Sequence, residues 1–155
     1  MNESDPIDAL VARFPRLFRG QSPKVMSFLP AGWTEPVTRL FIDLDAMLDD
    51  RQAQSFEVRQ IKEKLAGLRV YWRLGQEETT VLDIFGPEGA ERLSFRPEQT
   101  SSLYDRISAR VDQAEAEAAT TCQRCGNGSA SRRNVSGWLA TLCSACAQAR
   151  KSGKE

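Results

Sequence analysis

The chain has 155 residues, of which 41% are hydrophobic and 27% are charged, and its 21 basic residues balance its 21 acidic ones. This length suffices for one hydrophobic core, and the neutral balance argues against a protein whose whole surface binds nucleic acid. Residues 1–6 have no basic start and no apolar run follows them. No run of about 18 apolar residues occurs elsewhere, so we expect a cytoplasmic protein without a membrane-spanning segment.

Two helices are expected in the first third of the chain. Asp5 and Pro6 are a typical cap and first-turn pair for a short helix that ends near Phe14. A loop rich in Gly and Pro follows, and Thr34 is then the expected cap of a longer helix. The apolar residues of this second helix recur at helical spacing and predict one buried stripe: Val37, Leu40, Phe41, Leu44, Met47 and Leu48.

The pattern changes to a period of two between residues 56 and 74. This alternation predicts an antiparallel hairpin that turns near Ala66 and Gly67. A weaker strand pair, residues 79–85 and 92–95, should follow around Gly86, and a long helix should run from residues 100–102 to about Ala119. We therefore expect an α+β fold in which two long helices pack on an antiparallel sheet. The expected core includes Phe41, Leu44, Val70, Trp72, Ile107 and Val111.

Four cysteines form two Cys-x-x-Cys pairs near the C-terminus, Cys122 with Cys125 and Cys143 with Cys146, separated by seventeen residues. A two-residue gap lets both thiolates of a pair bind one ion, and the intervening segment suits a β-hairpin that returns the second pair to the first. Gly126 lies where a tight knuckle needs positive φ. The pattern predicts one structural Zn²⁺ in a treble-clef or zinc-ribbon-like module, because four thiolates leave no open position for catalysis. Disulfides are disfavoured because cytoplasmic thiols stay reduced.

Residues 120–155 carry six basic residues and one acidic residue, a formal charge of +5, which four thiolates around a divalent ion reduce to about +3. The long helix leads directly into the first cysteine pair. We therefore expect an α+β body over residues 1–119 and a zinc-binding module over residues 120–155 that is docked on the body. The basic residues that this module offers to phosphates are Arg124, Arg132, Arg133, Arg150 and Lys151.

No catalytic set is apparent in the sequence. The absence of histidine removes the commonest general base and every histidine-assisted nucleophile. Four aspartates between residues 43 and 50 form a candidate carboxylate cluster: Asp43, Asp45, Asp49 and Asp50. On a helical wheel they divide between the two flanks of the buried stripe, so we interpret them as a solvated surface. No phosphate-binding or nucleophile-elbow motif occurs. The sequence therefore does not favour an enzyme.

Aromatic and arginine residues are the candidate anchors for a partner. Arg69, Tyr71 and Arg73 alternate with the core residues of the central hairpin, so they should share its solvent face. Trp138 lies inside the zinc loop, where it either packs the module against the body or stays exposed as an anchor. Trp33, which directly precedes the long helix, is expected to staple that helix to the preceding loop.

Two segments resemble a group of small, mostly uncharacterised bacterial proteins. The first runs from Lys62-Glu63-Lys64 to Leu68-Arg69-Val70-Tyr71, and the second is Gly137-Trp138-Leu139-Ala140-Thr141-Leu142-Cys143. The chain departs from the group at Leu65-Ala66, where relatives tend to have Phe-Gly, and at Cys146, where many have histidine. Some members look like immunity partners of bacterial toxins, so the resemblance implies a toxin-binding role without catalytic residues.

Two functions follow as expectations. The first is a non-catalytic, zinc-containing bacterial binding protein, an immunity-type inhibitor whose partner is a toxin. The alternative is a nucleic-acid-associated zinc module, which would place its basic residues on phosphates and use Trp138 for stacking. Salt dependence separates the two, because phosphate binding weakens steeply as salt rises.

Overall fold

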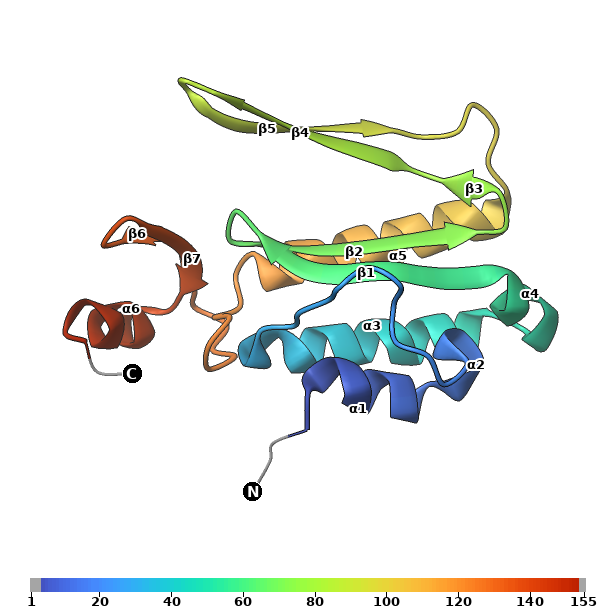
Figure 1. Cartoon of the computed structure of the whole chain (residues 1–155), viewed down its shortest axis with the longest axis horizontal. Coiled ribbons are helices and arrows are strands. Elements are labelled where there is room, and N and C mark those ends of the chain that lie inside the picture. The colour runs from blue at the N-terminus through green and yellow to red at the C-terminus, as the bar shows by residue number, and fades with distance from the viewer. Residues whose placement is uncertain (1–3, 154–155) are drawn as a thin grey trace.

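The computed structural model describes residues 4–153, in which antiparallel strands lie over a layer of helices and a small C-terminal unit adjoins one end (Figure 1). The helices are α1 (Pro6–Arg13), α2 (Pro15–Phe18), the 3₁₀ turn η1 (Ala31–Trp33), α3 (Thr34–Met47), α4 (Asp50–Ser55), α5 (Ser102–Ala118) and α6 (Ser144–Lys151). The strands are β1 (Phe56–Lys64), β2 (Gly67–Leu74), β3 (Glu77–Glu78), β4 (Thr80–Gly86), β5 (Gly89–Phe95), β6 (Ser131–Val135) and β7 (Trp138–Leu142).

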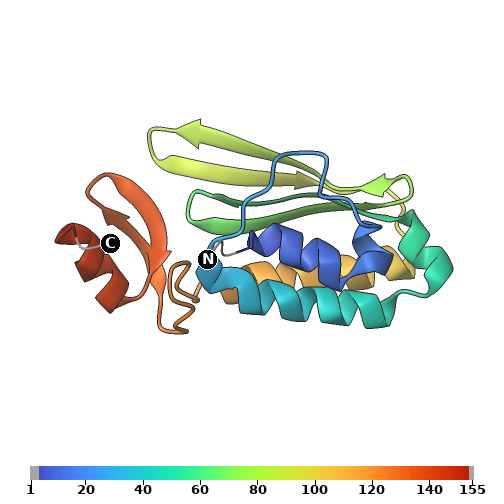
Figure 2. The same ribbon diagram turned by 60° about the horizontal axis from the view of Figure 1, so that its bottom comes forward.

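The first helix follows the expectation. The Asp5 side chain accepts a hydrogen bond from the backbone N–H of Ile7 at 2.8 Å, and Pro6 occupies the first helical position. Ile7, Leu10 and Val11 of α1 are buried against the rest of the body. Helix α1 therefore contributes to the core from the side of α3 (Figure 2).

The start of α3 differs from the expectation. Trp33 and not Thr34 is the N-cap residue, and no side chain caps the helix, because η1 feeds directly into α3. The expected stripe is confirmed in part: its first four members are fully buried, and Leu48 is buried just beyond the helix, whereas Met47 is half-buried. The short helix α4, which sequence periodicity did not reveal, begins at a capping box between Asp49 and Gln52.

The sequence predicts that the aspartates lie on two separate solvated flanks; Asp45 and Asp50 do remain accessible to solvent, but their separation is wrong because they converge on one arginine. Asp45 and Asp50 both pair with Arg16, at 2.7 and 2.9 Å. The guanidinium also donates to the backbone carbonyls of Asp45 and Leu48. The helix ends at Met47 and the chain turns into α4, so a helical wheel extended to Asp50 does not apply. Arg16 thus fastens α2 to the α3–α4 corner.

The central hairpin is confirmed. Strands β1 and β2 pair in antiparallel fashion from Phe56 opposite Leu74 to Lys64 opposite Gly67, with one irregularity between Val58 and Gln60. Leu65 and Ala66 adopt positive φ values of 53° and 67° in the turn, a conformation that strains residues with a side chain. Five of the six expected core residues are buried in one cluster, while Trp72 is half-buried against it.

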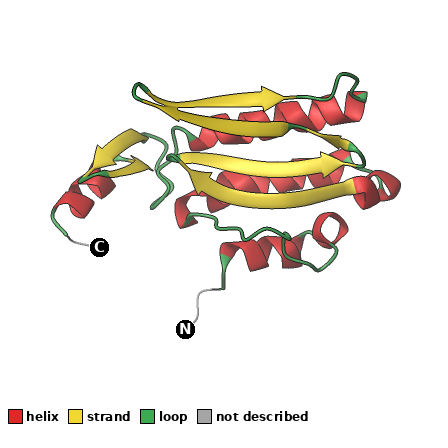
Figure 3. Cartoon of the chain, turned by 45° about the horizontal axis from the view of Figure 1, so that its top comes forward, coloured by secondary structure: helices red, strands yellow, loops and turns green. Residues whose placement is uncertain are grey.

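The strands form three separate ladders instead of one sheet. The first contains β1, β2 and β3, the second β4 and β5, and the third β6 and β7. Strand β3 pairs only with Arg73 and Leu74 of β2, and the chain then leaves β2. The β4–β5 hairpin consequently splays away from β2 (Figure 3). None of its residues, from Thr80 to Phe95, belongs to the core cluster of the described chain.

Helix α5 begins with Ser101 as N-cap, whose hydroxyl oxygen accepts from the backbone N–H of Tyr104. Its buried face packs on β2 and on α3, and Asp43 pairs with Arg110 across the two helices at 2.7 Å. Arg39 and Glu117 form a second pair between the same helices. Within residues 4–153, no helix combines the length and the apolar character that crossing a bilayer requires.

The C-terminal unit has its own small cluster of buried residues. It consists of the segment around Cys122, the β6–β7 hairpin and α6, and it lies beyond the end of the body where α5 finishes (Figure 1). Its buried members are Cys122, Ala130, Val135, Ala140, Leu142, Cys143 and Ala147. So few apolar residues make a core too small to hold the unit without further support.

Candidate metal centre

The first cysteine pair lies on a tight knuckle that directly follows α5. The backbone N–H of Gly126 donates to the carbonyl oxygen of Cys122 at 2.9 Å, and that of Cys122 donates to the carbonyl of Asn127 at 2.8 Å. Gly126 has φ of 82°, which glycine adopts without strain. The knuckle buries Cys122 and leaves Cys125 exposed.

The second pair lies where β7 passes into α6. Cys143 is the N-cap of α6, and its Sγ accepts from the backbone N–H of Cys146 at 3.5 Å. Cys146 lies in the first turn of the helix, so both sulfurs are near its positive end. That end favours thiolate over thiol.

The two pairs converge on one point. The four Sγ atoms all lie within 4.8 Å of one another, all four cysteines are free, and Cys125 Sγ is 3.7 Å from Cys143 Sγ. Four sulfurs at about 2.3 Å from a tetrahedral Zn²⁺ are about 3.8 Å apart, which matches this separation. The cluster therefore fits a metal ion held by Cys122, Cys125, Cys143 and Cys146.

The thiols differ in how readily they ionise. Burial disfavours the Cys122 thiolate, but hydrogen bonds from nearby backbone N–H groups, that of Cys125 first, outweigh it and lower the pKa of Cys122 to about 6. Burial and the neighbouring cysteine sulfurs raise the pKa of Cys146 to about 12. Several thiolates this close repel one another, so a bound divalent cation is what would allow all four to ionise together.

Gln123 joins the two halves of the metal centre. Its backbone N–H donates to the carbonyl of Thr141 at 2.9 Å, and its side-chain oxygen accepts from the backbone N–H of Thr141 at 3.0 Å. The first knuckle is thereby held against β7 by two hydrogen bonds. Nothing in the cysteine spacing reveals this role, because a glutamine between ligands has no signature of its own.

The C-terminal unit is docked on the body by three hydrogen bonds. The indole N–H of Trp33 donates to the carbonyl of Thr121 at 2.8 Å, and the backbone N–H of Gly32 donates to that of Gln123 at 2.9 Å. On the other side, the Thr141 hydroxyl donates to the carbonyl of Ala66, in the β1–β2 turn, at 2.7 Å. Trp33 and Thr141 are both buried. Trp33 therefore fastens the C-terminal unit to the body, a role that its position before α3 does not reveal.

Of the two positions expected for Trp138, packed between the module and the body or exposed as an anchor, the structure shows the exposed one. Its side chain lies on β7 and is 61% exposed, with the Arg150 guanidinium 5.5 Å from the ring centroid. Arg124, Arg132 and Lys151 are exposed, whereas Arg133 is half-buried and donates to the carbonyl of Leu142. Trp138 and Arg150 form a cation–π pair that is accessible from solvent.

The three strand residues predicted to bind a partner lie on β2 and are half-buried. Arg73 pairs with Glu57 at 2.7 Å, and the Lys62 ammonium lies 5.4 Å from the centroid of the Tyr71 ring. Arg69 has its Nε buried without a hydrogen-bond partner among the described residues. No hydrogen bond, ion pair or aromatic contact within residues 4–153 joins these three side chains to Trp138, so the structure does not bring the four candidates into one site.

An apolar face on the β4–β5 hairpin was missed by the sequence analysis. Leu82, Ile84 and Phe95 are 51%, 44% and 56% exposed. Leu82 is paired with Leu93, and Phe95 with Thr80, so these side chains share one face of the hairpin. The opposite face carries the residues that approach α5, such as Arg92, which pairs with Glu115. The available signal was the group of four apolar residues on either side of Asp83, between Val81 and Phe85, within a polar segment.

Comparison with models of protein families, with curated proteins and with solved structures found no match to this chain.

Proposed function

We propose that this chain is a non-catalytic binding protein in which a structural zinc ion secures a small module on an α+β body, and that its partner is another protein. A bacterial toxin is the partner we propose, with the chain acting as an immunity-type inhibitor in the cytoplasm. The observation that carries the proposal is the apolar face of the β4–β5 hairpin, which comprises the exposed side chains of Leu82, Ile84 and Phe95 and the half-buried Leu93 beside them.

The position of this face argues for recognition. The hairpin contributes no residue to the core cluster, so its apolar side chains are not required to fold the body. Exposed apolar patches are costly for a monomer in water and commonly mark protein interfaces. The neighbouring strand β2 presents Arg69, Tyr71 and Arg73, and arginine and tyrosine are frequent interface anchors. The absence of histidine from the sequence supports a role without catalysis.

Zinc is the metal we propose for the cysteine centre. Four thiolate donors in a compact cluster suit Zn²⁺ and fill its coordination shell, so the ion would stabilise the module and bind no substrate. The order of knuckle, hairpin and helix N-terminus supports a treble-clef-like arrangement. The free cysteines support a reducing compartment.

A pull-down from cells of the source organism tests the proposal. The tagged chain at moderate salt should recover one protein in near-equal amount, and the double variant Leu82→Asp/Phe95→Asp should lose it. The matched control is Val25→Asp/Ile42→Asp, which places the same charges at apolar residues of similar exposure, 45% and 42%, outside the hairpin. Equal loss in both double variants, or no stoichiometric protein, would contradict a specific interface on β4–β5.

A nucleic-acid-associated module is the alternative that one observation favours. Arg124, Arg132 and Lys151 are exposed, and none of them forms an ion pair within the described residues. Such a surface suits phosphate contacts, with Trp138 available for stacking on a base. Recovery of nucleic acid that disappears at high salt, in place of a protein, would promote this function.

A further inference from the structure

Strand β2 has an open edge inside the fold. Strand β1 pairs with β2 along its whole length, but β3 covers only Arg73 and Leu74 on the other side. Within the described chain, no strand pairs with residues 68–72 on that side. An unpaired strand edge presents backbone N–H and C=O groups at every second residue, and it is a ready template for another strand.

Strand β4 runs beside this edge without closing it. Continuing the β2–β3 register would pair Val70 with Val81, yet β4 pairs only with β5, and the Cα atoms of β2 and β4 lie farther apart than 8 Å along nearly all of their length. The far end of the opening is bridged by Lys64, whose Nζ lies 2.5 Å from the Asp83 carboxylate and 5.8 Å from the centroid of the Phe85 ring. We call the space between β2 and β4 the β2–β4 slot.

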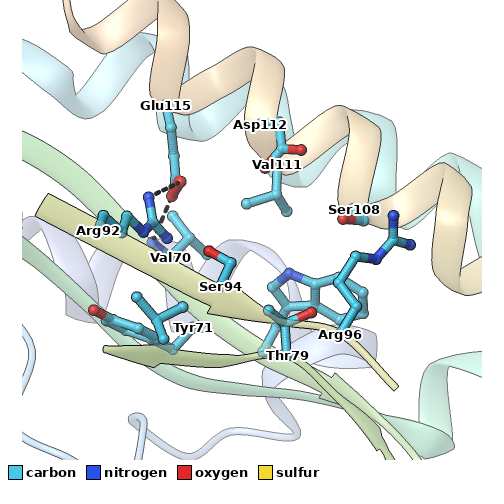
Figure 4. Close-up of a pocket in the computed structure, with 12 residues that line it drawn as sticks. Val70, Tyr71, Thr79, Arg92, Ser94, Arg96, Ser108, Val111, Asp112 and Glu115 are labelled. Carbon is cyan, nitrogen blue, oxygen red and sulfur yellow. Dashed lines mark hydrogen bonds and ion pairs between the residues drawn. The ribbon is translucent and has the colours of Figure 1, made fainter. Parts of the chain in front are cut away.

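The slot contains a cavity of about 200 Å³. Helix α5 forms its floor, and side chains of β2, the hairpin and α5 converge on it (Figure 4). The lining includes Val70 and Tyr71, which point to opposite faces of β2, so the cavity follows the edge of the strand. Other lining residues are Val81, Ser94, Val111 and Glu115.

At this edge the carboxylate of Glu115 accepts a backbone hydrogen bond that the carbonyl of a neighbouring strand would normally accept. The backbone N–H of Val70 donates to Glu115 Oε2 at 3.4 Å, near the upper limit for a hydrogen bond, while Glu115 Oε1 is held by Arg92 at 3.2 Å. The neighbouring strand that would normally accept this N–H is absent. Burial raises the pKa of Glu115, so the carboxylate is kept in the slot at an energetic cost.

A second donor on the same edge lacks an acceptor. Arg69 Nε is buried and has no hydrogen-bond partner within residues 4–153, although the guanidinium reaches the carbonyl of Leu68 at 3.4 Å. A buried donor without an acceptor is unfavourable, because it has lost its hydrogen bonds to water. The Arg69 guanidinium thus lies beside the stretch of β2 whose edge is open, although Arg69 does not line the cavity itself.

We propose that the β2–β4 slot binds an extended peptide segment of the partner protein, which adds to β2 as a strand. A carbonyl of the peptide takes the N–H of Val70 from Glu115, and an acceptor further along reaches Arg69 Nε. The occupant is a peptide backbone, because the edge of β2 offers donors and acceptors at strand spacing. This inference rests on the proposed protein-binding function and specifies how the partner is held.

A peptide library provides the test. Peptides of about ten residues, displayed on phage, are selected on the full chain and counter-selected on Ser94→Trp, which fills the slot from β5. The matched control is Ser131→Trp, the same substitution at an exposed position of β6, outside the slot and outside the apolar face of the β4–β5 hairpin. Selected peptides should bind the parent and the control alike, and Ser94→Trp should weaken them by about tenfold or more.

Backbone methylation of the best peptide tests the geometry without altering the protein. If the peptide binds as a strand, N-methylation should weaken binding by about tenfold at every second residue and leave the intermediate residues nearly unchanged. Methylation effects without this alternation would overturn the proposal. So would the selection of no peptide that depends on Ser94, or cross-strand NMR contacts between Val70 and Val81 showing that β4 closes the edge in solution.

The same variants separate the slot from the proposed function. A partner that is lost from Leu82→Asp/Phe95→Asp but retained by Ser94→Trp would overturn the slot and leave the protein-binding function standing. A strand-like peptide selected in vitro, with no partner protein recovered from cells, would support the slot and contradict the function.

Discussion

Gly32 lies against the first cysteine knuckle so closely that a Cβ at this position would be 2.0 Å from the carbonyl oxygen of Cys122 and 2.8 Å from the backbone nitrogen of Gly126. The contact is between two backbones, so no side-chain movement can relieve it. The buried Trp33 beside it donates to the carbonyl of Thr121, 88 residues away in the chain. The turn before α3 and the metal centre are therefore parts of one interface.

Gly32→Ala should detach or distort the C-terminal unit. Overpacking in a close contact costs about 1–3 kcal/mol, and a backbone clash has less room to relax than a side-chain clash. We expect a lower melting temperature and shifted amide resonances for residues 121–126. Gly128→Ala is the matched control in the same unit, because a Cβ there would meet nothing within 4 Å. Equal melting temperatures for the two variants would contradict the close contact.

Metal removal should unfold the C-terminal unit and leave the body folded. Protein purified without chelator should contain one zinc ion per chain, and Cys143→Ser should lose it, because binding of structural zinc contributes about 10–16 kcal/mol in small modules. NMR should show random-coil shifts for β6, β7 and α6 but preserved shifts for α3. Ser129→Ala, at an exposed position of the same unit, should retain the metal. Two disulfides by mass spectrometry and no metal would contradict the site.

Leu44→Ala should destabilise the whole body. Leu44 is completely buried on α3, and truncation of such a leucine leaves a cavity that costs about 2–5 kcal/mol. Chemical denaturation measures the loss as a lower midpoint. Ile42→Ala lies two residues away, is 42% exposed and should change stability by less than about 1 kcal/mol. Equal midpoints for Leu44→Ala and the parent would show that this face of α3 is not core.

Acid should loosen the β4–β5 hairpin. The hydrogen bond from Lys64 lowers the pKa of Asp83 in the folded state. The pair therefore stabilises the hairpin above the unfolded pKa of about 4, and this contribution is lost as pH falls through the folded pKa. Amide chemical shifts of β4 and β5 should move toward those of Asp83→Asn as pH falls, and the hairpin shifts of that variant should change less over the same pH range. Identical hairpin spectra of parent and Asp83→Asn at neutral pH would contradict this role.

The contribution of Glu115 to stability should depend on pH in the opposite direction to that of Asp83. Burial raises its pKa in the folded state, so its contribution is most favourable below the unfolded pKa and is lost as pH rises through the folded pKa. Glu115→Gln should therefore raise stability at neutral pH relative to the parent, and the difference should vanish in acid. Measuring both variants across one pH series separates the hairpin from the slot.

The sequence determined the parts of this protein that depend on local spacing. The two Cys-x-x-Cys pairs fix which sulfurs share one turn, and the helical period of Val37, Leu40, Phe41 and Leu44 fixes which side of α3 is buried. The alternation from Leu68 to Leu74 likewise fixes the two faces of β2. Each follows from the geometry of a single helix, strand or knuckle, which is the same wherever that element lies.

Tertiary structure decided which elements meet. Arg16 joins Asp45 and Asp50, Trp33 reaches Thr121, and β4 leaves the edge of β2 open although it follows β3 directly. These outcomes depend on the summed packing of segments far apart in the chain. The periodicity of residues within one segment carries no information about that packing. The metal ligands could therefore be predicted from their spacing, whereas the docking of the metal unit and the β2–β4 slot required the arrangement of the whole body.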